Sequence, residues 1–191
     1  MLFRSGWVFR HGFHNAGRPD AHKGARVAPH KKHEVQIAIK LRNMDLMKEV
    51  LMRVSDPASE EYGKHWTAEQ VAEMTANYEG SYKVRKYLEA RGARLTAKYG
   101  NEDMLHFEAP VSVWEEVLST EFYEFSHADF KGEKVVRAME YSLPLELDAE
   151  IDAVFKVAEL PARMNGMPTV IAEVGSTAAS ASTATTAATS S

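Results

Sequence analysis

Between residues 35 and 41 every second side chain is apolar, and beyond residue 43 the apolar side chains recur every three or four positions. The first spacing has the period of two that predicts a strand with one buried face. The second predicts an amphipathic helix that reaches Val54, with Asn43 as its cap and Pro57 ending it. The patterned part of the chain therefore begins with a strand followed directly by a helix.

Two further helices are predicted from their ends. Thr67 and Gln70 stand at the spacing of a capping box, in which each side chain accepts a hydrogen bond from the backbone amide of the other residue. A helix therefore begins after Thr67, and the segment before it is a folded connector between helices. A third helix runs from about Ser81 and ends at Gly92, because glycine is favoured just beyond a helix terminus.

The second half of the pattern predicts a hairpin, a helix and a strand. Apolar and polar positions alternate over residues 95–99 and 105–109 on either side of a Gly-Asn turn, which is typical of a β-hairpin. Ser112 and Glu115 repeat the capping-box spacing and predict a helix. Aromatic side chains over residues 122–125 predict the next strand.

The resulting order is strand, helices, strand, strand, helix, strand. It predicts an α+β domain of ferredoxin-like, split β-α-β architecture, with an antiparallel sheet and helices on one face. This architecture hosts metabolite sensors, RNA readers and electron carriers alike, so the fold does not decide the function.

Short stretches of sequence are more specific than the fold. Residues 55–71 read SDPASEEYGKHWTAEQV, residues 85–92 read RKYLEARG, and residues 137–144 read RAMEYSLP. Together with the strand and helix at 35–51 they resemble the activation domain, or propeptide, of sedolisins, the acid-acting serine-carboxyl peptidases that include kumamolisin and tripeptidyl peptidase I.

The resemblance covers roughly residues 34–160. It departs from the family pattern at Glu60, where the family has a second proline, and at Tyr87, where the family has tryptophan. The positions of this chain that match the family motifs are Asn43, Ser55, Asp56, Pro57, Tyr62, Gly63, Lys64, His65, Thr67, Gly92, Arg137, Tyr141 and Pro144.

The resemblance implies an inhibitor and folding chaperone of a sedolisin, from a precursor whose catalytic domain is absent here. The family's Ser, Glu and Asp catalytic residues lie in a separate, larger domain, and no such domain follows residue 161. We therefore expect no catalytic residue in this chain. The implied partner is the cognate sedolisin catalytic domain, in cis or in trans, and the implied location is secreted, lysosomal or vacuolar. Arg4 interrupts the apolar start, so residues 1–10 are not a convincing signal peptide.

Charge and composition suggest three regions. Residues 1–33 carry seven Lys and Arg against Asp20, a net charge of +6, which leaves −10 for the rest of a chain of net charge −4. We expect 1–33 to be a basic flexible N-terminal segment, either a solvated terminus or an arm against an acidic partner surface. Residues 34–160 form the activation domain. Residues 161–191 form a linker and a disordered tail that contains only Gly, Ser, Thr and Ala from residue 175.

Composition also excludes several classes of function. The absence of cysteine excludes disulfides, thiolate metal sites and a cysteine nucleophile. No apolar run approaches the roughly 18 residues that span a bilayer, and an acidic body argues against nucleic acid. The histidines near the N-terminus are irregularly spaced, so we expect no metal site and no cofactor. No Gly-x-Ser-x-Gly, His-Glu-x-x-His or phosphate-loop motif is present.

Aromatic and arginine side chains dominate buried protein contacts, which makes five residues candidates for the partner interface. The alternative is that the aromatic side chains form the core of the sheet itself. Protonation of carboxylates and of His65, His106 or His127 is expected to weaken the interface at acid pH. The five candidates are Phe122, Tyr123, Phe125, Phe130 and Arg137.

Two other functions remain open. One is a stand-alone peptidase inhibitor that acts in trans. The other is a ferredoxin-like module that binds a ligand or RNA, although no strand carries the Lys/Arg-Gly-Phe/Tyr-Gly/Ala-Phe pattern of RNA-binding domains.

Overall fold

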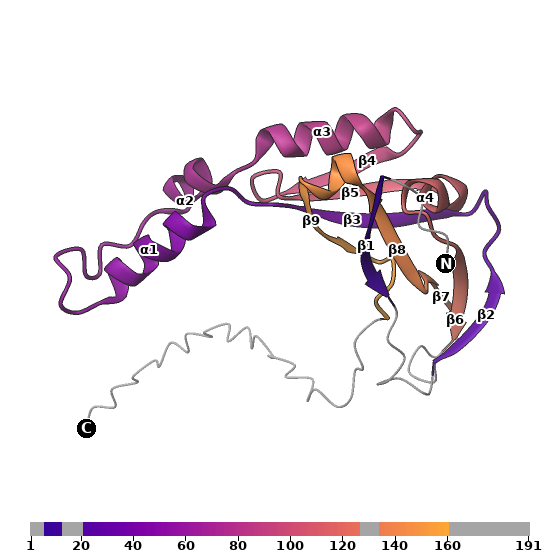
Figure 1. Ribbon diagram of the computed structural model, residues 1–191, viewed down its shortest axis with the longest axis horizontal. Helices are drawn as coiled ribbons and strands as arrows, with labels where there is room; N and C mark the ends of the chain where they lie inside the picture. Colours follow the sequence, from indigo (N-terminus) through magenta and orange to yellow (C-terminus); the bar gives the residue numbers. More distant parts are fainter. Residues whose placement is uncertain (1–5, 13–20, 127–133, 161–191) are drawn as a thin grey trace, which may run out of the picture.

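The strand predicted at residues 35–41 lies inside a four-stranded antiparallel sheet in the computed structural model, which describes residues 6–12, 21–126 and 134–160 (Figure 1). Val35 lies opposite Phe107 on one neighbouring strand, and Ile37 lies opposite Val154 on the other. The predicted hairpin is present and forms two of the strands. The order across the sheet is β4 (Arg94–Tyr99), β5 (Met104–Pro110), β3 (Lys32–Ile39) and β9 (Ile151–Phe155).

Helices α3 (Tyr78–Glu89) and α4 (Val111–Val117) contribute to the core on one face of this sheet. Leu88 and Trp114, one from each helix, are fully buried in the same cluster as the inward side chains of β3 and β5. Helix α3 ends as predicted, with Gly92 in the left-handed region at φ +91°. The order of strands and helices confirms the ferredoxin-like α+β fold.

The fourth strand of that fold is not the one predicted from the aromatic run. Strand β6 (Phe122–Ser126) lies in a separate three-stranded sheet, between β2 (His22–Arg26) and β7 (Lys134–Ala138). The fourth place beside β3 is taken by β9. Strand β9 has only five residues, and two of them are buried, so its sequence pattern is too short to show a period of two.

The prediction that residues 1–33 are flexible is wrong for the part of them that the structure describes. Strand β1 (Trp7–Gly12) pairs with β8 (Glu140–Pro144), and β2 pairs with β6. Ala21 and Val27, on either side of β2, are buried. Backbone hydrogen bonds to β8 and β6 offset the conformational entropy that β1 and β2 lose when they become ordered. Both strands therefore belong to the domain.

The basic residues of the N-terminal strands pair with the acidic body of the same chain. Arg10 forms an ion pair with Asp148, and its guanidinium also donates to the backbone oxygens of Asp148 and Ile151 at 2.8 and 2.9 Å. Other lysine and arginine side chains of this region also pair with carboxylates of the same chain, so their charges are not left free for an acidic surface of a partner. The pairs are Arg26 with Glu115 and Glu121, Lys31 with Glu124, and Lys32 with Glu108.

Two helices project from this body as an arm (Figure 1). We call residues 43–76 the helical arm. It consists of α1 (Met44–Ser55), the connecting loop with the SDPASEEYGKHWT sequence, and α2 (Ala68–Thr75). Val50 and Val54 are the buried residues of α1, while Leu51 and Met52 are 60% and 65% exposed. A short helix, α5 (Leu145–Asp148), joins β8 to β9. None of the helices in the described ranges is long and apolar enough to cross a bilayer.

Of the two predicted capping boxes, the structure contains one. The Thr67 hydroxyl accepts from the Gln70 amide at 3.3 Å, and the Gln70 side chain accepts from the Thr67 amide at 2.9 Å. The second prediction is wrong, because α4 begins after Pro110 with no side-chain cap. The Glu115 carboxylate accepts instead from the Phe122 amide, which belongs to another sheet.

Replacing Thr67 by alanine should destabilise α2 by about 1 kcal/mol, because the Gln70 amide loses its acceptor. Replacing Ser112 by alanine is the matched control, and its effect should stay within about 0.5 kcal/mol. Amide hydrogen exchange, followed residue by residue along α2 and α4, measures both changes. Equal effects of the two substitutions would contradict the assignment of the caps.

Candidate interaction surface

One face of the four-stranded sheet carries half-buried and exposed side chains, whereas the other carries the core. On β3 the odd-numbered positions from Val35 to Ile39 are buried, and the even-numbered positions between Glu34 and Ala38 are half-buried. The same alternation holds along β5. We call the second side the open face. Its side chains are Glu34, Gln36, Ala38, Tyr99, Met104, His106, Glu108, Ala153 and Phe155.

Charges on the open face are paired. The Glu34 carboxylate accepts from Lys156 Nζ at 2.7 Å and from the Gln36 amide at 3.3 Å, and it lies 3.5 Å from His106 Nδ1. The hydrogen bond from Lys156 holds the pKa of Glu34 below its ordinary value. The Tyr99 ring lies 4.7 Å from the His106 ring. The imidazole therefore sits between an aromatic ring and a carboxylate at the centre of the face.

Glu108 forms a second charged group at the end of the face, away from the arm. Its carboxylate lies 2.9 Å from Lys32 Nζ and 3.3 Å from the Arg94 guanidinium. The hydrogen bond from Lys32 lowers the pKa of Glu108. The small or unbranched side chains of Ala38, Met104 and Ala153 lie beyond these charges. A partner surface with complementary charges at one end and apolar groups at the other fits this arrangement.

The open face continues into the helical arm. A pocket of about 520 Å³ lies where β3 leads into α1, and Ala38, Leu41, Met44 and Met104 form its apolar wall. Leu41 and Met44 are 40% and 53% exposed, so this wall is open to the surroundings. Lys40, Asp103 and Asp152 contribute the polar part of the wall. The sheet and the arm thus share one surface.

The motif residues of the connecting loop have local structural roles. Helix α1 ends at Ser55, and Pro57 follows directly after the C-cap residue. The Asp56 carboxylate accepts from the Ala58 amide at 2.9 Å, and the Gly63 amide donates to the Val54 oxygen at 2.9 Å. Gly63 has φ +73°, a conformation that glycine adopts without a steric cost. These contacts agree with the interpretation of this segment as a folded connector.

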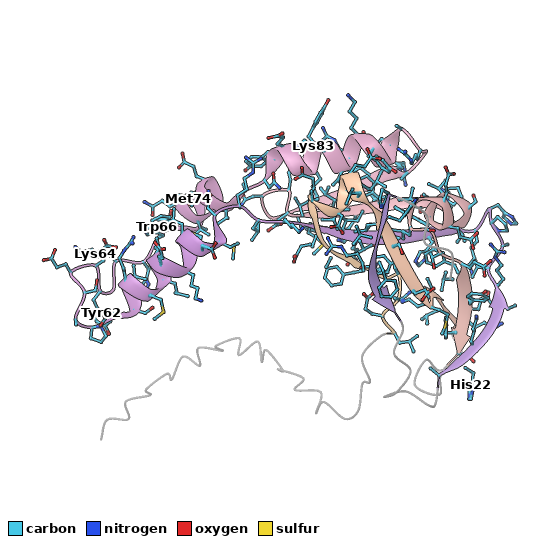
Figure 2. All side chains as sticks on the ribbon, in the orientation of Figure 1. His22, Tyr62, Lys64, Trp66, Met74 and Lys83 are labelled. Atoms are coloured by element: carbon cyan, nitrogen blue, oxygen red, sulfur yellow. The ribbon has the colours of Figure 1, made fainter. Side chains whose placement is uncertain are left out.

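Three side chains of the same loop point away from these contacts. Tyr62 is 57% exposed, and Lys64 and His65 are also exposed. Figure 2 shows Tyr62 and Lys64 at the far end of the arm. Trp66 is half-buried and lines a pocket with Asn43. The loop therefore keeps its backbone inside the arm and presents a tyrosine, a lysine and a histidine to the surroundings.

Asn43 precedes α1 as predicted, but its side chain does not cap the helix. Its backbone is left-handed at φ 54°, whereas a capping residue needs an extended backbone to reach the first amides of its own helix. The Asn43 amide donates instead to the Met74 backbone oxygen at 2.8 Å. This residue fastens the start of α1 to the end of α2.

Another asparagine, which the sequence analysis did not identify, connects the arm to the body. Asn77 is buried at the start of α3, where its carbonyl oxygen accepts from the Gly80 amide at 3.0 Å. Its amide group donates to the Lys40 backbone oxygen at 3.0 Å. The sequence pattern did not identify Asn77 as a helix cap, because it predicted that α3 begins only at about Ser81.

The closing motif lies in the core and at its edge. Tyr141 is 5% exposed, and burial raises the pKa of its hydroxyl. Pro144 is buried at the end of β8. The Arg137 guanidinium donates to the backbone oxygens of Val136 and Glu159, and partial burial lowers its pKa. These positions hold the end of the domain together.

The candidate interface predicted from aromatic residues is wrong at two positions. Phe122 and Phe125 are 0% and 2% exposed, so they belong to the core, as the alternative had it. Tyr123 is half-buried, with Lys23 Nζ 3.4 Å from its ring centre, and Arg137 has the backbone contacts given above. Neither has been tested as a contact residue, so both stay predictions. Phe130 and His127 lie outside the described residues.

Two features define the class of this domain. The first is a ferredoxin-like α+β fold with an open sheet face, and the second is a helical arm that extends that face. The model of the family described as the pro-kumamolisin activation domain matches residues 19–160. The chain therefore belongs to the family of pro-kumamolisin activation domains. The match begins before residue 34, in agreement with the inclusion of β2 in the domain.

Known relatives are similar to most of the chain. Physarolisin of Physarum polycephalum is 34% identical over 142 residues, which are 73% of this chain and 24% of that protein. Tripeptidyl-peptidase sed1 of Aspergillus fumigatus is 32% identical over 121 residues, 62% of this chain and 19% of that protein. Tripeptidyl-peptidase 1 of Mus musculus is 31% identical over 138 residues, 71% and 25% of the two chains. The chain thus spans about a quarter or less of these relatives.

Proposed function

We propose that this chain is the activation domain of a sedolisin precursor, which inhibits the catalytic domain and assists its folding. Its partner is the cognate sedolisin catalytic domain, in cis or in trans, and the contact surface is the open face with the adjoining side of the helical arm. The chain itself supplies no catalytic residue. The compartment is that of the peptidase, secreted or lysosomal.

The observation that carries this proposal is the place where the chain leaves the domain. Residues 156–160, which we call the exit segment, follow β9 directly, and Lys156 Nζ contacts Glu34 on the open face. A partner docked on that face therefore lies beside Lys156, the first residue of the exit segment. An extended chain can occupy a peptidase cleft through backbone hydrogen bonds. Its attachment to a folded, docked body lowers the entropy lost on binding.

The surface chemistry supports a protein partner more than RNA. Glu34 and Glu108 place two carboxylates on the open face, where a nucleic acid would require cations that are free to bind phosphate. Both carboxylates are instead paired with lysine or arginine of the same chain. Partly exposed apolar side chains beside paired charges are typical of protein interfaces.

Titration of the purified chain against a sedolisin catalytic domain tests the proposal. Peptide hydrolysis is followed at mildly acidic and near-neutral pH while the concentration of the chain is varied. We expect tight inhibition near neutrality that relaxes on acidification. Absence of inhibition, with the chain shown to be folded by circular dichroism, would contradict the proposed function.

A further inference from the structure

A second pocket of the helical arm has an aromatic wall. Its volume is about 330 Å³, and its walls come from the residue before α1, the end of the connecting loop and α2. The lining residues are Asn43, Trp66, Gln70, Glu73 and Met74. In Figure 2, Trp66 and Met74 lie between the far end of the arm and the body. This pocket shares no lining residue with the one that joins the open face to the arm, so the two are separate.

Hydrogen bonds within the arm hold the walls of this pocket in place. Asn43 Nδ2 donates to the Met74 backbone oxygen at 2.8 Å and lies 3.6 Å from Met74 Sδ. The Gln70 side-chain oxygen accepts from the Thr67 amide at 2.9 Å. These contacts occupy the Asn43 nitrogen and the Gln70 oxygen. The Asn43 oxygen and the Glu73 carboxylate accept no hydrogen bond from the described residues, so both remain available to a ligand.

Negative charge is concentrated on this part of the chain. Residues 43–76 carry seven Asp and Glu against three Lys and Arg, a net charge of −4, and α2 itself has two glutamates and no cation. Glu73 lies in the last turn of α2, where the backbone oxygens give the helix end a partial negative charge. Within the described ranges of the chain, Glu73 forms no ion pair. A cation beside Glu73 therefore stabilises both the carboxylate and the helix end.

The Trp66 ring gives the pocket a second group that attracts cations. The ring is half-buried, and tryptophan is the aromatic side chain whose face attracts a cation most strongly. A guanidinium can use the ring and the two free acceptors together, because it is planar, stacks on aromatic faces and donates several N–H groups in its plane. A lysine ammonium is more strongly hydrated and has no planar surface to stack. The pocket therefore fits arginine better than lysine.

We propose that this pocket binds an arginine side chain of a protein partner, with the guanidinium stacked on Trp66 and its N–H groups donating to the Glu73 carboxylate and the Asn43 oxygen. Tryptophan and arginine are among the residues most enriched where a few side chains supply most of the binding energy of an interface. That the arginine belongs to a sedolisin catalytic domain rests on the function proposed above. The binding of a guanidinium is a property of this chain alone.

Glu69 provides a matched comparison. It is exposed on the same helix and carries the same charge as Glu73, but it does not line the pocket. It lies in the first turn of α2, where hydrogen bonds with its own backbone amide and with the Thr67 side chain lower its pKa. Glu69→Gln therefore removes one negative charge from the arm and leaves the walls of the pocket intact. The affinity of this variant for arginine should equal that of the natural chain.

Nuclear magnetic resonance titration of the full chain with the methylamide of Nα-acetylarginine tests the inference without any peptidase. We expect this probe to shift the indole N–H signal of Trp66 and the side-chain amide signals of Asn43 and Gln70. The indole signals of the other two of the three tryptophans should not move. Glu73→Gln and Trp66→Leu should each weaken binding by about two- to fivefold, because one removes the ion pair and the other the aromatic face.

Two comparison probes, the corresponding norleucine and lysine derivatives, test the occupant in the natural chain and need no variant to fold. Both should bind more weakly than the arginine derivative. The inference is overturned if the arginine derivative does not shift the Trp66 signal, or if either comparison probe binds as tightly. Equal weakening by Glu73→Gln and Glu69→Gln would also overturn it, because the arm would then attract any cation by its net charge. Failure to inhibit a sedolisin would reject the proposed function and leave these measurements unaffected.

Discussion

Replacement of Trp114 by alanine should lower the free energy of unfolding by about 4 kcal/mol. The side chain is fully buried between α4 and the sheet, and its indole N–H donates to the His33 oxygen at 2.9 Å. The substitution leaves a cavity and an unpaired buried oxygen. Because domains of this size are stable by about 5–15 kcal/mol, the variant should be marginally folded. Urea unfolding followed by circular dichroism measures the change.

Two further variants separate the causes. Trp114→Phe keeps most of the volume and removes the hydrogen bond, so it should cost about 1–3 kcal/mol. Trp66→Ala makes the same change of residue type on the helical arm, where the side chain is half-buried, and should cost less than Trp114→Ala. A loss of stability under about 2 kcal/mol in Trp114→Ala would contradict the position of this residue in the core.

Replacement of Ala38 by arginine should weaken inhibition of a sedolisin catalytic domain by at least about 100-fold. Ala38 lies at the end of the open face that adjoins the arm, opposite Met104 and Ala153, and lines the pocket that joins the face to the arm. A long cation at this position separates two surfaces that dock there and places a charge among apolar side chains. The inhibition constant of the purified variant near neutral pH is the measurement.

Ala90→Arg is the matched control. Ala90 is exposed at the end of α3, on the helical side of the sheet, so the same change there should leave the inhibition constant within about threefold. Thermal unfolding establishes that both variants are folded. If Ala38→Arg is folded and inhibits as well as the natural chain, the open face is not the docking surface, and the exposed end of the helical arm becomes the next surface to examine.

Local patterns predicted local structure well. The strand at residues 35–41, the β4–β5 hairpin and the Thr67 capping box each depend on neighbours within a few residues, and all three are present. Ser112 shows the limit of such patterns. It has the same spacing to Glu115 as Thr67 has to Gln70, yet Glu115 accepts from the Phe122 amide. The Glu115 side chain is therefore used in a tertiary contact and does not form the local cap that the spacing predicted.

The candidate site followed from the sequence only in part. The motif matches identified the family correctly. They include Asp56 and Gly63, whose contacts lie within α1 and the connecting loop and so depend on nearby residues alone. The aromatic residues proposed for the interface were drawn from composition, and composition does not distinguish a core strand from an exposed one. Phe122 is buried because β6 packs inside a second sheet, whose other strands come from residues 22–26 and 134–138.

The sequence by itself determined the elements with a clear period, the capping of α2, the C-terminal ends of α1 and α3, and the family. Tertiary structure alone decided that β9 is the fourth strand, that β1 and β2 belong to the domain, and that His33 meets the exit segment, which follows it by more than a hundred residues. The physical reason is that strand pairing depends on backbone hydrogen bonds between distant segments. Those bonds leave almost no trace in the order of side chains along either segment.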